Sequence, residues 1–505
     1  MLFMSDNSLE HIIIVGGGSA GWMTAAMLSH QLQGNCQITL IESEQIGTIG
    51  VGEATIPPIK VFNNLLGIQE NEFLSQCNGS IKLGIQFENW HQTSHQYFHQ
   101  FGRFGTDFDY IPFPYYWLKS KQHGNPLGLQ EYSSAWHMAK RNKFIPPAQD
   151  KRSLFSGMDY AYHFDASLYA NYLKSLAIKN GVKHIDGIID KVKTRDSDGF
   201  IESVTLDSGE LYQGDFFVDC SGIRSLLLGQ TLNVDFIDWS EHLLCDRAVA
   251  VQTTHQSAIA PYTRSIAHEA GWQWRIPLQT RMGNGNVYSS QFMSDEQATD
   301  ILTSTIEGEM LTEPRVIKFK PGRRQEFWRK NCVAVGLSAG FLEPLESTSL
   351  HLIQRAIMRL VSYFPDKRCD LVNTQEYNRI TQDEYEHIRD FIILHYKATE
   401  RDDSEFWRYC KDMVIPESLN QRMALFGQDG HLLIKDSELF KQDSWLAVLT
   451  GQGILPKQAA PIMKFKQQVE IEQTLNAIHK NLSQTAEKVP GHEMYLAQNC
   501  RHTPK

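Results

Sequence analysis

The N-terminal region of the chain alternates short apolar runs with a glycine-rich turn. The apolar run His11–Val15 predicts a buried strand, and residues 37–41 predict a second strand that leads into acidic residues. Between these two strands, residues Ser19–Leu32 have the composition of a helix. Strand, glycine turn, helix and strand in this order predict a βαβ unit and, with it, a parallel sheet.

Apolar and polar residues alternate strictly from position 81 to position 88. The pattern predicts one strand with two faces, an apolar face of Ile81, Leu83, Ile85 and Phe87 and a polar face of Lys82, Gly84, Gln86 and Glu88. From this pattern alone, Lys82 is expected to be a solvent-exposed lysine.

The composition changes after position 90. Residues 91–149 are rich in aromatic residues, His, Gly and Pro and show little periodicity, which predicts a loop-rich insertion. Further on, the pattern predicts a helix at 168–178 and strands at 188–193, 200–206, 216–218 and 332–335. From Leu350 apolar residues recur at helical spacing, and charged helices follow up to about Glu487, after which we expect loosely structured chain.

The overall composition is that of an ordinary globular protein. Of the 505 residues, 42% are hydrophobic and 21% are charged, which excludes a disordered or collagen-like chain. The formal net charge of −10 argues against a nucleic-acid binder and against a polybasic membrane-surface protein. No stretch approaches the roughly 18 apolar residues of a membrane helix, and the run 12–15 is too short for a signal peptide. The eight cysteines are scattered without a C-x-x-C pair, so we expect reduced thiols in a cytoplasmic protein.

The turn after the first strand carries a dinucleotide-binding pattern. Its G-x-G-x-x-G is Gly16-Gly17-Gly18-Ser19-Ala20-Gly21. The first glycine permits the tight turn, the second lets phosphates approach, and the third lets helix and strand pack closely. Glu42, at the end of the next strand, is placed to accept ribose hydroxyls. A purely structural glycine turn would leave Glu42 unexplained.

Two later segments favour FAD over NAD as the dinucleotide. Residues 217–224, with Asp219, resemble the second signature of FAD-dependent monooxygenases. Residues 332–340, with Gly336 and Leu337, resemble the strand and turn that those flavoproteins use near the ribityl chain. Each pattern alone is a common buried strand followed by a turn, but the three occur in the expected order.

The sequence also resembles the flavin-dependent halogenases, the group typified by the tryptophan halogenases. The matching stretches are GGGSAGWM (16–23), GVGEATIP (50–57), SIKLGIQFENW (80–90), WQWRIP (272–277) and FLEPLEST (341–348). The W-x-W-x-I-P motif distinguishes the family and is more specific than the glycine turn. The resemblance covers about residues 10–365 and weakens toward the C-terminus.

We therefore expect an α/β fold with an FAD-binding module of the flavoprotein-monooxygenase type (GR2 type), an inserted loop-rich segment and a helical C-terminal subdomain. The module covers residues 1–90 and 150–350. The insertion, residues 91–149, lines the substrate pocket, and residues 351–505 form the helical substrate-side part.

Lys82 matches the lysine that this family places between flavin and substrate. In the family, reduced FAD and O2 give a flavin hydroperoxide, halide attacks it, and the hypohalous acid must be directed to the substrate. An ammonium group can hydrogen-bond to the oxidant, or the amine can itself be halogenated. The match implies this role, whereas the strand pattern alone implies a solvated side chain.

Glu346 matches the family's essential glutamate. Electrophilic substitution develops positive charge on an aromatic ring, and a nearby carboxylate can stabilise it and take the proton. The alternative is a glutamate that only interacts with a helix dipole. Thr348 and Ser349 stand where backbone N–H groups of the next helix are free, which makes them candidates for binding chloride or bromide. Family members commonly carry glycine at the position of Ser349.

The resemblance implies further residues around the flavin and the substrate. Trp272 and Trp274 would separate the flavin from the substrate, although alternating tryptophans in a strand are also common core residues. Residues 50–56, with Gly52, Glu53 and Ala54, match the segment that links flavin and lysine. The substrate-pocket candidates are His99, Phe101, Pro112, Phe440 and Trp445. His91, His95 and His99 are evenly spaced, but their neighbours offer no ligand shell, so we expect no metal site.

The C-terminal region departs from the tryptophan-specific members of the family. Those carry a Tyr-Tyr pair and a Phe-Trp pair that hold the amino acid, whereas this chain has Gln428-Asp429 and Leu439-Phe440 at the related places. Free tryptophan is therefore a doubtful substrate, and a simpler or larger indole or phenol is expected.

The expected function is regioselective chlorination or bromination of an electron-rich aromatic, an indole by preference, with FADH2, O2 and halide. No second dinucleotide pattern for NAD(P)H is visible, so a separate NAD(P)H-dependent flavin reductase should supply the FADH2. The alternatives are an FAD-dependent aromatic hydroxylase and a non-catalytic flavin-binding protein. A homodimer is left open.

Overall fold

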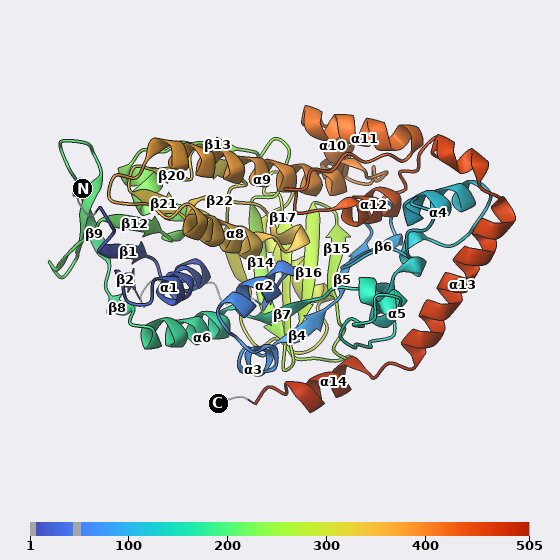
Figure 1. Cartoon of the computed structure of the whole chain (residues 1–505), viewed down its shortest axis with the longest axis horizontal. Helices are drawn as coiled ribbons and strands as arrows, with labels where there is room; N and C mark the ends of the chain where they lie inside the picture. Colours follow the sequence, from blue (N-terminus) through green and yellow to red (C-terminus); the bar gives the residue numbers. More distant parts are fainter. Residues whose placement is uncertain (1–6, 44–51, 504–505) are drawn as a thin grey trace, which may run out of the picture.

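The computed structural model describes residues 7–43 and 52–503, and it contains the predicted βαβ unit (Figure 1). Strand β1 (His11–Val15) pairs in parallel with β2 (Gln37–Glu42), and helix α1 (Ser19–Leu32) connects them. On its other side β1 pairs in parallel with β12 (Phe216–Asp219). Strands β8 (Lys183–Asp186), β21 (Cys332–Ala334) and β20 (Trp328–Arg329) complete a six-stranded sheet in the order β20-β21-β12-β1-β2-β8. The expected α/β fold is thereby confirmed.

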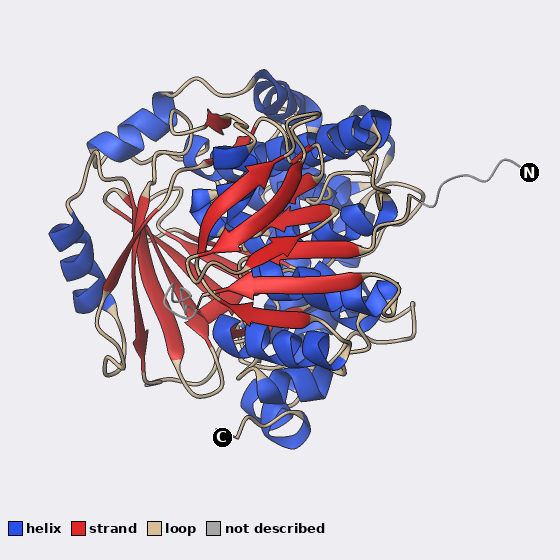
Figure 2. Cartoon of the chain, turned by 90° about the vertical axis from the view of Figure 1, so that its left-hand side faces the viewer, coloured by secondary structure: helices blue, strands red, loops and turns tan. Residues whose placement is uncertain are grey.

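A second, seven-stranded sheet lies beside the first. Its order is β18-β14-β17-β16-β15-β5-β6, with strands β5 (Gly84–Glu88), β6 (Gln96–Gln100), β14 (Arg247–Thr253), β15 (Thr263–His268), β16 (Gly271–Pro277), β17 (Met282–Tyr288) and β18 (Arg315–Lys318). Figure 2 shows the strands gathered in the middle of the molecule with helices around them. Parallel pairing of β5 with β15 joins the early part of the chain to its middle.

The predicted single strand at 81–88 is in fact two strands in two different sheets. Strand β4 (Ser80–Lys82) belongs to a small sheet, β3-β7-β4, with β3 (Gly52–Ala54) and β7 (Ala161–Asp165). The chain leaves this sheet at Leu83, whose N–H donates to the Pro261 carbonyl and whose carbonyl accepts from the Phe101 N–H. Because other elements cover both faces at this point, Lys82 is fully buried, and the expectation of an exposed lysine is wrong.

The other predicted elements of the middle region are present with slightly shifted ends. They are α6 (Ala166–Lys179), β9 (Ile189–Thr194) and β10 (Ile201–Leu206), besides β12 and β21. Shorter elements complete this part: α2 (Pro58–Leu65), α3 (Glu70–Gln76), η2 (Leu154–Gly157), β11 (Leu211–Gln213), η3 (Gly222–Arg224), η4 (Leu226–Thr231), β13 (Phe236–Asp238), α7 (Asp295–Thr305), β19 (Gly322–Arg324), η5 (Gly336–Ser338), β22 (Gly340–Phe341) and η6 (Pro344–Glu346).

The C-terminal third is helical, as expected. It comprises α8 (Ser349–Ser362), α9 (Leu371–Lys397), α10 (Glu405–Asp412), α11 (Glu417–Asp429), α12 (Gln442–Gly451), η7 (Pro461–Phe465), α13 (Gln468–Glu487) and α14 (His492–Asn499). The expectation of loose structure after Glu487 is wrong, because α14 packs on the body of the protein. His492 on α14 is buried, its Nδ1 donates to the Ile259 carbonyl at 2.8 Å, and its Nε2 accepts from the Ile81 N–H at 3.2 Å.

Residues 91–149 carry more regular structure than their composition indicates. Besides β6 they contain α4 (Phe113–Gln122), the 3₁₀ turn η1 (Leu129–Tyr132) and α5 (Ser134–Ala139). The division of the chain into domains stays a prediction. Across residues 7–43 and 52–503, every helix is too short or too polar to span a bilayer. All eight cysteines lie in the described ranges, and each is buried and unpaired.

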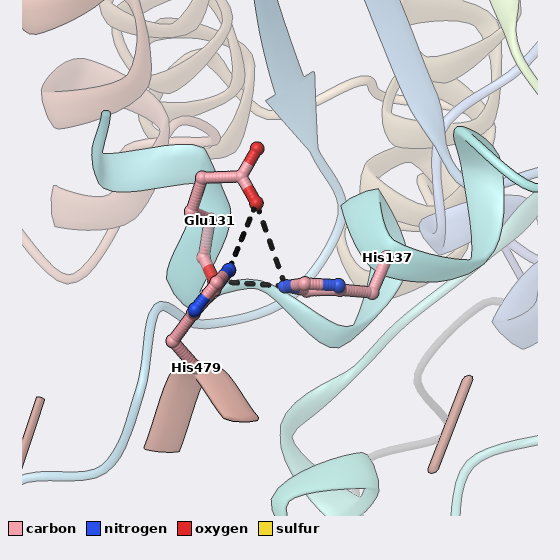
Figure 3. Close-up of side chains that lie close together, drawn as sticks. All are labelled: Glu131, His137 and His479. Carbon is pink, nitrogen blue, oxygen red and sulfur yellow. Dashed lines mark hydrogen bonds and ion pairs between the residues drawn. The ribbon is translucent and has the colours of Figure 1, made fainter. Parts of the chain in front are cut away.

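Glu131, His137 and His479 lie together where α13 packs against η1 and α5 (Figure 3). The Glu131 carboxylate and His137 Nε2 already have protein partners. The Glu131 carboxylate accepts from Lys140 Nζ at 2.7 Å and from Trp136 Nε1 at 2.8 Å. His137 Nε2 donates to the Glu131 carbonyl at 2.9 Å, and burial lowers the pKa of this histidine to about 4. With an ammonium group on the same carboxylate, the cluster serves as a structural contact that holds α13 in place.

Glu131→Ala is expected to destabilise the protein, because it removes the acceptor shared by Trp136 and Lys140 and the contact with His479. The free energy of unfolding should fall by about 1–2 kcal/mol, measured by denaturant titration. The matched control is Glu202→Ala, which breaks the solvent-exposed Lys193–Glu202 ion pair and should leave the free energy of unfolding nearly unchanged. Equal effects of the two substitutions would contradict the structural role of the cluster.

Candidate active site

A cavity of about 860 Å³ lies at the carboxyl ends of the parallel strands. This is where open α/β sheets bind their ligands. Most of the cofactor residues expected from the sequence line it, namely Gly16, Gly18, Ser19, Ala20, Glu42, Gly52, Glu53, Ala54, Gly336 and Leu337. Residues 50 and 51 of the expected flavin-to-lysine segment lie outside the described residues.

Each glycine of the first turn is required for a different structural reason. Gly16 has φ +108°, and a Cβ there would lie 2.2 Å from the Cys220 carbonyl oxygen. A Cβ on Gly21 would lie 1.8 Å from the Gly16 carbonyl oxygen, so this glycine is needed for packing rather than for ligand contact. A Cβ on Gly18 would meet no protein atom within 4 Å, because Gly18 faces the cavity.

The N-terminus of α1 is open toward the same cavity. It has no side-chain cap and no acidic residue in its first turn, so its free N–H groups and positive dipole end are available to an anion. Glu42 lies beside the glycine turn, where a Cβ on Gly17 would be 1.6 Å from its Oε2, and its carboxylate contacts His184 Nε2 at 2.8 Å and Lys174 Nζ at 3.0 Å. A pyrophosphate on the helix N-terminus and a ribose at Glu42 therefore fit the residues present.

Asp219 is placed differently from the other cofactor candidates, because it does not line the cavity. Its buried carboxylate accepts backbone N–H groups of Ser221 at 3.0 Å, Leu227 at 2.9 Å and Leu228 at 2.8 Å. It therefore shapes the turn that follows β12, and the turn lines the cavity.

The buried Lys82 side chain reaches the turn that follows η6. Its Nζ donates to Ser347 Oγ at 2.8 Å and lies 5.2 Å from the centroid of the Phe101 ring. Burial lowers the pKa of Lys82 to about 7, and the charge of Glu346 opposes this shift. The side chain is thus near the point where it can both hold and release a proton at neutral pH.

Glu346 ends the turn η6 and is also fully buried. His99 Nδ1 donates to its carboxylate, at 2.9 and 3.0 Å from the two oxygens. His395 Nε2 on α9 lies 2.8 Å from Oε1. Burial alone would raise the pKa of Glu346, but His99 and His395 outweigh it and lower the pKa to about 2. The carboxylate is therefore ionised at neutral pH.

His395 was not found from the sequence. It stands in an apolar stretch of the long helix α9, where a histidine looks like an ordinary core residue, and its partner is remote in the chain. Ser347, which follows Glu346, has φ 59°, a left-handed conformation that is unusual for a residue with a side chain. This conformation turns the chain so that Ser347 binds Lys82 while Glu346 binds the two histidines.

Thr348 and Ser349 are located as expected at the start of α8. Thr348 is the N-cap residue but makes no side-chain cap, and its buried Oγ1 has no hydrogen-bond partner among the described residues. Ser349 lines the large cavity. A helix N-terminus with an unused hydroxyl next to the cavity fits a halide ion.

The aromatic candidates divide into two groups. Trp272 and Trp274 lie on β16, with ring centroids 6.2 Å apart, and both line the cavity. Gly285 on β17 stands opposite Trp274, where a Cβ would lie 2.0 Å from the indole, so that glycine makes room for it.

The second group surrounds His99. Phe440 stacks on Phe391 at 3.8 Å, and Trp445 meets Phe391 edge-on at 4.9 Å. The His99 ring is 5.8 Å from Phe391 and 6.3 Å from Phe440. Pro112 stands at the N-terminus of α4, outside the lining of the large cavity.

Comparison with known proteins gives one consistent family. The profile described as tryptophan halogenase matches residues 11–468. Tryptophan 6-halogenase ThaL of Streptomyces albogriseolus is 35% identical, over 92% of this chain and 93% of that protein. Two solved structures also match. A flavin-dependent halogenase from Xanthomonas campestris superposes with a TM-score of 0.95 and 44% identity, over 99% of this chain and 100% of the other. BrvH, a flavin-dependent halogenase from Brevundimonas sp. BAL3, superposes with a TM-score of 0.94 and 42% identity, over 98% of this chain and 99% of the other.

Gly18→Val is expected to weaken FAD binding without unfolding the protein, because the new side chain meets only the space that the pyrophosphate would occupy. The dissociation constant should rise on the order of tenfold or more, as measured by titrating apo-protein with FAD. Gly21→Val is the contrasting variant and should lower the melting temperature, because its Cβ collides with backbone. Unchanged affinity in Gly18→Val would exclude a phosphate at this turn.

Lys82→Met is expected to stabilise the protein while abolishing its chemistry. The folded lysine has a pKa of about 7 against 10.5 when unfolded, so burying its charge is costly at and below pH 7. Between pH 7 and 10.5 only the unfolded state holds this proton, so wild-type stability gains with rising pH and the variant's advantage shrinks. We expect an advantage of about 1–3 kcal/mol at pH 6.5 that fades toward pH 10, measured by denaturant titration. If the variant were less stable than the wild type at pH 6.5, burial of the Lys82 charge would not be costly and the interpretation would be wrong.

Proposed function

Since this chain belongs to the tryptophan halogenase family and is a flavin-dependent halogenase, we propose that it uses FADH2, O2 and chloride or bromide to halogenate an indole. The observation that carries the assignment of roles is the link through Ser347. Lys82 binds the Ser347 hydroxyl, and Glu346 is its neighbour in the chain. One turn thus sets the lysine and the carboxylate in fixed relation between the cavity and the aromatic cluster of Phe391, Phe440 and Trp445.

The cavity would hold the flavin. The N-terminus of α1 would bind the pyrophosphate, Glu42 would bind the ribose, and the Trp272 and Trp274 side of the cavity would face the ring system. When bound and reduced, the flavin supplies the electrons with which O2 and halide give hypohalous acid. The chain shows no second dinucleotide pattern, which supports a separate NAD(P)H-dependent flavin reductase as its partner.

Lys82 would receive the hypohalous acid. Its buried ammonium group has one close hydroxyl partner, Ser347, and keeps donors for the oxidant's oxygen. Such a hydrogen bond makes the oxygen a better leaving group, so the halogen becomes more electrophilic. Trp272 and Trp274 would keep the substrate away from the flavin, which disfavours direct oxygen transfer and so the hydroxylase alternative.

Glu346 would stabilise the positively charged ring that halogen attack produces. A fixed anion in a dry site interacts strongly with developing positive charge, and it needs no reorganisation at that moment. Thr348 and Ser349 would bind the halide on the cavity side of the same turn, close to where it is oxidised.

The substrate would be an indole without a zwitterionic side chain. Two of the ion pairs in this part of the chain are internal: Arg422 donates to both oxygens of Glu438 at 2.8 Å, and His431 pairs with Asp429 at 2.6 Å. Phe391, Phe440 and Trp445 present aromatic surface instead. This combination suits a flat apolar ring better than an amino acid. Eight buried free cysteines also support the reducing cytoplasm as its location.

The function is tested by mass spectrometry of a reaction mixture with FAD, a reductase, halide and indole. A halogenase adds chlorine or bromine to the product, a hydroxylase adds oxygen, and a non-catalytic flavoprotein adds neither. Glu346→Gln should lose halogenated product yet still deliver hypohalous acid to a trapping reagent. Loss of both in this variant would move Glu346 to the flavin or halide side.

Free tryptophan is expected to be a poorer substrate than indole or C3-modified apolar indoles. A site with partners for an ammonium and a carboxylate can favour the amino acid by orders of magnitude in kcat/KM. In an apolar pocket both charged groups lose their water without gaining partners, which is unfavourable. Turnover per enzyme should therefore fall at least about tenfold from indole to tryptophan, measured by product quantification. A tryptophan rate equal to that of the best indole would show that the amino acid is bound elsewhere.

A further inference from the structure

Glu53 differs from Glu42, the other acidic residue that lines the large cavity. The Glu42 carboxylate is paired with Lys174 and His184. Among the residues that the structure describes, no group donates a hydrogen bond to the carboxyl group of Glu53, and no cation pairs with it. A carboxylate that is withdrawn from bulk water without such a partner is unfavourable, so the position of Glu53 favours its neutral form.

The charged group that acts on Glu53 is a second acid, Asp165. Strand β3 pairs with β7 so that Gly52 is opposite Asp165, and Glu53 is therefore one position away. Burial, and after it the negative charge of Asp165, raise the pKa of Glu53 to about 7. Of the two acids only Asp165 has a cation, because Arg281 Nη2 donates to it at 2.6 Å. The proton that the pair retains near neutral pH therefore belongs to Glu53.

The other elements that pack on β3 bring no charge that would stabilise an ionised Glu53. On β7, His163 is opposite Ala54, and burial lowers the pKa of this histidine well below its ordinary value, so it is neutral. On β16 and β17, the residues nearest to Gly52 are Ile276 and Gly283, which are uncharged. Solvent is thus the only source of stabilisation for the carboxylate, and a ligand that fills the cavity would remove it.

FAD would bring negative charge into this space through its pyrophosphate. The cations that line the cavity are Lys174 and Arg224, and neither acts on the carboxyl group of Glu53. An ionised Glu53 would repel the cofactor, whereas a neutral carboxyl group carries a hydrogen that it can donate to an oxygen or nitrogen of FAD. The residues present therefore favour binding with the proton in place.

We propose that Glu53 binds FAD as a neutral carboxylic acid, so that the enzyme takes up a proton with the cofactor and loses affinity for it when Glu53 ionises. The inference rests on the proposed function, in which this cavity holds the flavin. Solvent supplies the proton to the carboxylate of the free protein, and the complex retains it. At acidic pH the free protein already holds the proton, so the affinity should level off there.

Glu53→Gln tests the proposal, because Gln keeps the shape and a donor but cannot ionise. Calorimetric titration of apo-protein with FAD, in buffers of different ionisation enthalpy, counts the protons that are taken up. At pH 8 the wild type should take up about one proton more per FAD than Glu53→Gln. From pH 7 to pH 8.5 the dissociation constant of the wild type should rise on the order of tenfold relative to that of the variant.

Asp165→Asn should shift the effect in a defined direction. Asn can still cap helix α6, whose N-terminus Asp165 caps in the wild type. Without the charge of Asp165, and with Arg281 released, Glu53 should ionise more easily, so the loss of FAD affinity should begin at a lower pH. Glu202→Gln is the matched control, because Glu202 lies outside the cavity in an exposed pair with Lys193, and it should reproduce the pH dependence of the wild type.

Three results would count against these proposals. The same proton uptake and pH dependence in Glu53→Gln and in the wild type would overturn the inference. So would a loss of FAD affinity at every pH in Glu53→Gln, because binding would then need the carboxylate itself. A wild-type protein that binds FAD at no pH would instead reject the proposed function, and the inference with it.

Discussion

A carboxylate that is completely removed from water is costly, and the architecture around Glu346 exists to offset that cost. The two imidazoles that do so come from distant parts of the chain, one from β6 and one from the long helix α9. The Glu346 carboxylate therefore gains both of its imidazole partners only when β6 and α9 have packed around the turn η6. Ser347, in its left-handed conformation, then fixes Lys82.

Lys82 of β4 and Glu346 of the turn η6 both have lowered pKa values, which favours the neutral form of the lysine and the ionised form of the glutamate. Burial makes the Lys82 ammonium easy to deprotonate, whereas two histidines keep Glu346 ionised despite equal burial. A labile proton and a permanent negative charge thus stand next to each other. Neither property is visible from residue type, because each depends on what surrounds the side chain.

Local signals in the sequence predicted the first βαβ unit, the glycine turn and the start of α8, because strand and helix periodicities and glycine positions act over a few residues. The burial of Lys82 could not be predicted in this way. Perfect alternation at 81–88 indicates one half-exposed strand, and only the bonds of Leu83 to Pro261 and Phe101 split it between two sheets. The role of His395 likewise depends on a partner, Glu346, that only the fold brings next to it. The family resemblance predicted Glu346 as a site residue but did not predict the residues that contact it. Regular structure after Glu487 was missed because its short helix packs through one histidine and few apolar residues.

The contact between His492 and the backbone of Ile81 has a consequence for how the protein is made. The two residues lie 411 positions apart, yet the imidazole occupies the open edge of the strand that carries the lysine. At a synthesis rate of roughly 5–20 residues per second, the strand leaves the ribosome about 20–80 s before its partner does. During that interval the strand exposes an unpaired edge of the kind on which nascent chains associate wrongly. The centre that performs the chemistry is thus completed late in synthesis, and until then its protection must come from other segments or from chaperones.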